Sequence, residues 1–179
     1  DRSNDKALAD FSGQMHEQLR NQFNLSQAET VWVGKCPVFV FWDTAQFRRF
    51  AAEVDRSSRA KPKAARSDGY HATRGRFSYI VINGVKDLGA STQQATTRFF
   101  EVLVHEGTHG FLSRYISDRS LPLWIEEGLA DYMAATLVPA GGATRKCMAG
   151  ARYALQTPNA LSSLFSKNEL TSIDYGIAQ

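Results

Sequence analysis

Two histidines, His105 and His109, lie four positions apart in a segment whose apolar residues recur at helical spacing. Helical geometry stacks side chains at positions i and i+4 on one face, one turn apart. Val102, Leu112 and Ile116 share that face, so the two imidazoles are expected to be half buried and to need polar partners. This helix must therefore pack where a polar group or an ion can reach both rings.

The residues around the histidine pair suit a metal site. Both imidazoles can reach one tetrahedral ion at about 2.0–2.1 Å. Glu106 lies one step round the helix from His105, where a carboxylate can take a proton from a metal-bound water without being a ligand. A pattern this short also arises by chance, and helical histidines can be ordinary surface residues. The chain has only 4 histidines, however, and two of them fall in this one turn, which favours a functional role.

A third ligand is available in the segment 122–132. Glu127 lies 18 positions after His109 on the next predicted helix, and a short connection makes the two helices antiparallel neighbours. Glu127 can then turn back onto the histidine face. Two imidazoles, one carboxylate and an open fourth position form the arrangement of a catalytic zinc site. Glu126 competes for the same role, but on a helix it points about 100° away from Glu127.

These residues resemble the motifs of a known family. His-Glu-x-x-His at 105–109, followed by Trp-x-x-Glu-Gly-x-Ala-x-Tyr at 124–132, is similar to the gluzincins of the peptidase MA-like superfamily. The resemblance spans roughly residues 95–135 and extends more weakly to the strand–helix–strand segment upstream. It implies a zincin-like lobe in which Zn²⁺ is held by His105, His109 and Glu127, with Glu106 as general base. The chain also resembles a group of exported bacterial proteins in that superfamily, which implies a periplasmic or extracellular location.

The reaction that the resemblance implies is hydrolysis of a peptide bond in a peptide or protein substrate. Zinc lowers the pKa of its bound water to about 7, and Glu106 takes the proton and later delivers it to the leaving amine. Tyr175 is the candidate oxyanion donor because it resembles the start of a Tyr-x-x-Gln helix, with Tyr132 and Tyr153 as alternatives. That helix is expected to continue past the end of the sequence, so the single domain over 1–179 is expected to be truncated there.

Three other polar residues are weighed as parts of the site. Asp131 lies four positions after Glu127 on the same helix face, and zinc-bound histidines usually donate their second N–H to a carboxylate or carbonyl. We therefore predict that Asp131 accepts a hydrogen bond from His105; the alternative is an ordinary surface acid. His71 could approach the site, although such a histidine is more often a surface residue, and His16 is expected to be structural or exposed.

Hydrophobic periodicity predicts an α+β domain with a small mixed sheet. Helices are expected at 5–24, 91–115, 123–137, 144–155 and 158–166, with a short helix opened by Asp43 and strands at 37–42 and 77–82. In zincins the substrate adds as a strand to a sheet edge near the metal. The candidate edge here is 77–82, where backbone hydrogen bonds would hold an extended peptide.

A basic run separates the two predicted strands. Residues 56–76 carry seven basic side chains against one acid, Asp68, although the net charge of the whole chain is only +3. A solvated loop is the preferred interpretation, because no aromatic residue interleaves the run before Tyr70. The alternative is that this loop binds an anionic polymer or recruits acidic substrates. No specific nucleic acid is expected as a partner.

The sequence disfavours several other classes of protein. The two cysteines, Cys36 and Cys147, do not form a disulfide framework, and whether they are bridged stays open. The longest apolar stretch, 38–42, is far shorter than the roughly 20 residues that span a bilayer, so no transmembrane segment is predicted. A zinc-containing binding module without turnover is the main rival function. Glu106 argues against it, because a structural zinc site prefers four protein ligands and needs no general base.

Overall fold

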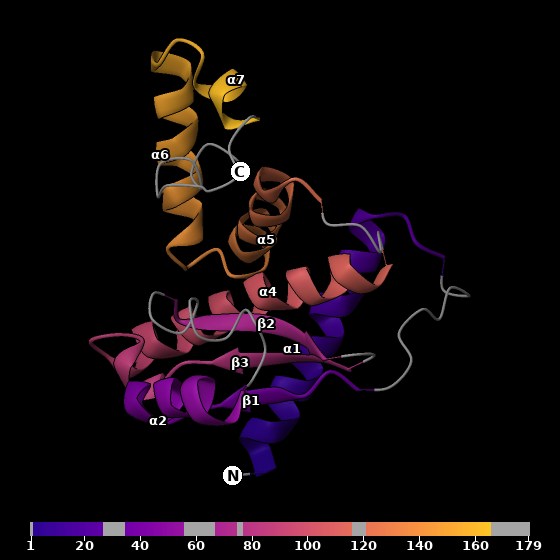
Figure 1. Cartoon of the computed structure of the whole chain (residues 1–179), viewed down its shortest axis with the longest axis vertical. Coiled ribbons are helices and arrows are strands. Elements are labelled where there is room, and N and C mark those ends of the chain that lie inside the picture. Colours follow the sequence, from indigo (N-terminus) through magenta and orange to yellow (C-terminus); the bar gives the residue numbers. More distant parts are fainter. Residues whose placement is uncertain (1, 27–34, 56–66, 75–76, 116–120, 166–179) are drawn as a thin grey trace.

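Figure 1 shows a computed structural model in which helices pack on both faces of a small sheet. It describes residues 2–26, 35–55, 67–74, 77–115 and 121–165. The helices are α1 (Arg2–Gln22), α2 (Thr44–Arg49), α4 (Thr92–Tyr115), α5 (Leu123–Leu137), α6 (Ala143–Gln156) and α7 (Ala160–Leu164), with a π-helical turn η1 (Phe50–Val54) and a 3₁₀ turn η2 (Val85–Asp87). The strands are β1 (Val38–Val40), β2 (Gly69–Arg74) and β3 (Phe77–Ile82). The predicted α+β class is confirmed.

The sheet has the strand order β1-β3-β2, with β1 parallel and β2 antiparallel to β3. It is the small mixed sheet that the sequence predicts. The prediction that residues 77–82 form a sheet edge is wrong, because β3 pairs on both sides and is the central strand. The edge strand missing from the prediction is β2, which lies in the segment interpreted as a basic loop. Its first four residues are buried, so packing decides its structure despite the neighbouring charges.

The two faces of the sheet pack against different helices because successive side chains of a strand point to opposite sides. Ile80 of β3 meets Val102 and Leu103 of α4 on one face. The next residue, Val81, packs with Phe47 of α2 on the other face, where both side chains are fully buried. Helix α4 therefore rests directly on the sheet and carries its polar side chains close to strand β2.

Helices α4 and α5 form the second layer of the core. Val104 and Phe111 of α4 and Met133 of α5 are buried in one cluster, which Leu19 of α1 joins. Figure 1 places α5 on the side of α4 away from the sheet, with α6 and α7 beyond it. The apolar contacts between α4 and α5 bring the polar side chains of the two helices together at their interface.

Several further predictions can be compared with the structure. Asp43 caps α2 as predicted, since its Oδ1 accepts a hydrogen bond from the backbone N–H of Gln46 at 2.8 Å. His16 has the structural role expected, with its Nε2 atom 3.0 Å from the Tyr115 hydroxyl. Cys36 and Cys147 are free thiols. Within the described part of the chain, none of the helices has the length and apolar character needed to cross a membrane.

Candidate metal centre

The predicted histidine pair lies on α4 with its two rings facing each other. The Nε2 atoms of His105 and His109 are 3.2 Å apart, and the ring centroids are 4.9 Å apart. The exposed fraction of the side chain is 21% for His105 and 9% for His109. The pair is thus largely buried, as expected for two imidazoles on an otherwise apolar helix face.

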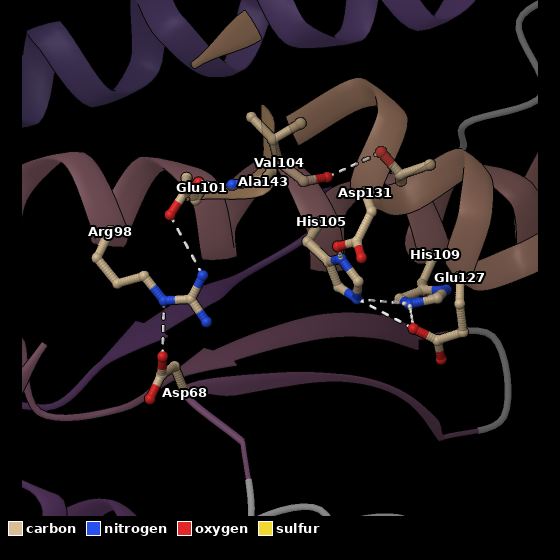
Figure 2. A network of polar contacts seen from close by, with 10 residues as sticks. Asp68, Arg98, Glu101, Val104, His105, His109, Glu127, Asp131 and Ala143 are labelled. Carbon is tan, nitrogen blue, oxygen red and sulfur yellow. Dashed lines mark hydrogen bonds and ion pairs between the residues drawn. The ribbon is translucent and has the colours of Figure 1, made fainter. Parts of the chain in front are cut away.

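Glu127 of α5 completes a three-residue cluster with the histidines (Figure 2). Its Oε2 atom lies 3.3 Å from Nε2 of His105 and 3.6 Å from Nε2 of His109. The carboxylate comes from the first half of α5 and reaches the second half of α4, so the two helices are neighbours, as the sequence predicts. The adjacent Glu126 is half-buried and lies outside this cluster.

The spacing of the three ligand atoms fits a metal ion. A tetrahedral ion with bonds of about 2.0–2.1 Å holds its ligand atoms roughly 3.3–3.4 Å apart. The three separations here are 3.2, 3.3 and 3.6 Å. Acceptor atoms at such distances need a proton or a metal ion between them, because their lone pairs would otherwise repel one another. The His105–His109–Glu127 cluster could therefore hold a metal ion.

Asp131 lies where the sequence predicts, one turn after Glu127 on α5. Its Oδ1 atom is 2.8 Å from Nδ1 of His105, and its side chain is only 10% exposed. Because an ionised carboxylate can only accept, Nδ1 carries the proton of this hydrogen bond. The Nε2 atom of His105 is thereby directed towards Glu127 and is the nitrogen available to an ion.

The carboxylates around His105 favour a positive charge at this site. Burial lowers the pKa of His105, but hydrogen bonds to Asp131 and Glu127 outweigh burial and raise the pKa to about 10. Burial likewise opposes ionisation of Glu127, but hydrogen bonds from His105 and His109 hold the pKa of its carboxyl well below the usual range. In the metal-free protein a proton on the imidazole occupies the position that a metal ion would take.

Glu106 is buried between α4 and the edge strand β2, beside the ligand cluster but outside it. Its Oε2 atom accepts a hydrogen bond from the backbone N–H of His71 at 2.8 Å. The imidazole of His71 is only 3% exposed, and its Nε2 atom lies 2.7 Å from the Ser78 hydroxyl oxygen. Of the two alternatives for His71, the structure excludes a surface residue, and it is the main chain of His71 that approaches the predicted general base.

Other predicted site elements lie elsewhere in the chain. Tyr175 and residues 56–66 of the basic run lie outside the described residues. The alternative oxyanion donors, Tyr132 and Tyr153, are 42% and 40% exposed. The role of oxyanion donor thus stays a prediction for each of the three tyrosines.

Sequence reasoning missed a polar network beside the ligand cluster. Figure 2 shows Arg98 between Asp68 and Glu101, with the backbone of Ala143 at the other side of Glu101. Glu101 is one helical turn before His105, and this spacing was the only available signal. A lone glutamate on a helix is ordinarily solvated, but this one is only 3% exposed.

Comparison of the chain with family models, with curated proteins and with solved structures finds no match. Inferences about this site therefore rest on its own residues and their geometry.

Proposed function

We propose that this chain is a zinc-dependent peptidase of the gluzincin kind. The observation that carries the proposal is the spacing of the three ligand atoms, which fits a tetrahedral ion with one open position. Two imidazoles and one carboxylate suit zinc better than magnesium or calcium, which prefer oxygen ligands. The proposal includes a zincin-like arrangement of the α4–α5 pair over the sheet.

Glu106 is the residue that distinguishes an enzyme from a structural zinc site. When bound, zinc would acidify a water molecule and polarise the carbonyl group of a substrate. Glu106 would accept a proton from that water at its carboxylate and deliver it to the leaving amine. The His71 N–H contact holds the Glu106 carboxylate on the strand side of α4, next to His105 in sequence. Its burial keeps the carboxylate in a fixed orientation.

The free edge of strand β2 is the proposed binding place for the peptide backbone of a substrate. Among the described strands, β2 pairs only with β3, and Glu106 lies against its other edge, where it accepts the His71 N–H. The rest of that edge could pair with an added strand. This assignment replaces residues 77–82, which are enclosed by β1 and β2. An extended peptide segment of a protein is the substrate class that fits such an edge.

The test compares the zinc-loaded wild type with Glu106→Gln on an unfolded casein substrate. We expect one zinc per chain in both proteins and cleavage lower by about 100-fold or more in Glu106→Gln, the range for a lost general base. Glu126→Gln is the matched control, because it removes one carboxylate from the neighbouring helix outside the cluster. It should cleave like the wild type, and His105→Ala should lose the zinc.

Equal background cleavage by wild type and Glu106→Gln, with zinc bound in both, would instead favour a binding module. In that module the ion would serve only to join α4 to α5. Absence of zinc from the wild type would reject both functions.

A further inference from the structure

The carboxylate of Glu101 is enclosed by groups from two other segments of the chain. It belongs to α4, one turn before His105, and is only 3% exposed. Its Oε1 atom accepts a hydrogen bond from the backbone N–H of Ala143 at 2.7 Å, and its Oε2 atom accepts one from Nη1 of Arg98 at 3.2 Å. Both oxygens of a buried carboxylate are thus satisfied, as its burial requires.

The turn between α5 and α6 closes over this carboxylate. A Cβ atom added to Gly141 would overlap Glu101, so the turn can lie this close only because residue 141 has no side chain. Ala143 is the first residue of α6, where backbone N–H groups have no partner within the helix. No side chain of the helix itself caps this end, and Glu101 supplies the acceptor. The negative charge also suits the positive end of the helix dipole.

Arg98 extends the contact to the edge strand. Its Nε atom lies 2.7 Å from Oδ2 of Asp68, the residue before β2. One turn of α4 therefore binds both the end of the α5–α6 turn and the start of the strand that contacts Glu106. The first contact holds the segment that follows the ligand-bearing helix α5, and the second holds the strand whose backbone binds the proposed general base.

The metal centre needs a contact of this kind because its ligands come from both helices. His105 and His109 belong to α4 and Glu127 belongs to α5, so a shift of α5 relative to α4 changes the separations of the ligand atoms. The Glu101–Ala143 hydrogen bond joins α4 to the segment that follows α5, and it involves none of the ligands.

We propose that Glu101 is a positioning residue, which holds the α5–α6 turn on α4 so that Glu127 keeps its distance from the two imidazoles before an ion binds. This inference rests on the metal site of the proposed function. It makes the protein a preorganised zinc site, in which little of the binding free energy is spent on bringing the helices together.

The experiment measures zinc affinity by competition with a chelating dye, and the absorption spectrum of the Co²⁺-substituted protein. Glu101→Ala should weaken zinc binding on the order of tenfold or more, as loss of outer groups of a metal site does, and should change the Co²⁺ spectrum. Glu101→Gln keeps an oxygen acceptor for the Ala143 N–H but turns its amide NH2 towards Arg98, so both readouts should be closer to the wild type than in Glu101→Ala. Phe47→Leu, on the far face of the sheet, is the control for general loss of stability.

A second variant tests the same contact if Glu101→Ala does not fold. Ala143→Pro removes the N–H donor at the first position of α6, where proline is favoured, and leaves the Glu101–Arg98 pair in place. It should weaken zinc binding as Glu101→Ala does. Wild-type zinc affinity and an unchanged Co²⁺ spectrum in either folded variant would overturn the inference alone. A wild type that binds no zinc would overturn the proposed function with it.

Discussion

The backbone nitrogen of His71 on strand β2 lies 2.8 Å from Oε2 of Glu106 on α4. Because the N–H groups of successive strand residues point in opposite directions, this donor lies on the side of β2 that faces away from β3. The proposed general base therefore occupies a donor on the free edge of the sheet. The contact joins a side chain to the main chain, so it does not depend on the identity of residue 71.

Hydrogen exchange can test this contact without metal or substrate. In the metal-free protein the His71 amide should exchange slowly, although it is on an edge, because the Glu106 carboxylate accepts its proton. Glu106→Ala should accelerate exchange of this amide by about tenfold or more, the equivalent of losing a hydrogen bond to a charged group. Glu106→Gln keeps an acceptor and should have a smaller effect. The Ala72 amide, which faces β3, should be unchanged in both variants, and equal acceleration there would indicate general loosening of β2 instead.

Removing the carboxylate behind His105 should weaken zinc binding. Asp131 accepts a hydrogen bond from Nδ1 of His105 and thereby orients its Nε2 atom towards the cluster. Asp131→Ala should therefore raise the dissociation constant for zinc by about 10–100-fold, measured by competition with a chelating dye. Glu126→Gln carries the same change of charge on the same helix and should bind zinc like the wild type. An unchanged affinity in Asp131→Ala would mean that packing alone orients the ring.

The stability of the metal-free protein should fall from neutral to alkaline pH. His105 has a folded-state pKa of about 10, above its ordinary 6.5, so its stabilising effect is complete below about pH 6.5 and is lost as the pH rises towards 10. The pKa of Glu127 is lowered, so its effect is complete above its ordinary 4.5 and is lost as the pH falls below that value. The pair therefore contributes most between about pH 4.5 and 6.5.

Urea unfolding in the presence of a chelator measures this dependence. The midpoint should be higher near about pH 6 than near about pH 9, and the difference should shrink in His105→Gln. Zinc reverses the direction, since the ion displaces the proton and its affinity should rise over the same interval. A wild-type midpoint that increases towards pH 9 would contradict the proposed protonation of the metal-free site.

A buried hydrogen bond on the other face of the sheet should contribute to stability but not to the metal site. The hydroxyl group of Tyr70 donates to Asp55 at 2.7 Å, and both residues are buried. Tyr70→Phe should lower the free energy of unfolding by about 1–3 kcal/mol, measured with urea. Tyr79, which donates to the other oxygen of Asp55 at 2.9 Å, is less buried, so Tyr79→Phe should cost less. Unequal losses in the opposite order would show that Asp55 depends mainly on Tyr79.

The helices in which apolar residues recur at helical spacing could be predicted from the sequence. Helix α5 occupies residues 123–137 as expected, and α4 ends at Tyr115 as expected. The ligand cluster follows from these two helices, because a short connection makes them neighbours and Glu127 is only 18 positions after His109. The contact between Asp131 and His105 could be predicted for the same reason, since both residues have fixed places on their helix faces.

Strand β2 and the contacts of Glu101 could not be predicted in this way. Strand β2 contains Gly69, His71 and Arg74 within a basic run, and its burial comes from packing against α4 and α2 instead of from an alternating pattern. Glu101 meets a backbone N–H that is 42 positions away, in a turn whose path depends on the whole α5–α6 pair. Partners of this kind belong to the main chain and have no sequence signature.

The order of the ligands along the chain has a consequence for folding. His105 and His109 are within one turn of α4, and Glu127 follows only 18 positions after His109. Because the entropy of closing a loop grows with its length, an ion held first by the two imidazoles could capture Glu127 at small entropic cost. Such contacts are local in the sequence, and proteins that are rich in local contacts fold fast. Metal added during refolding should therefore accelerate formation of the α4–α5 hairpin, and the ion would act as a folding nucleus before it acts in any reaction.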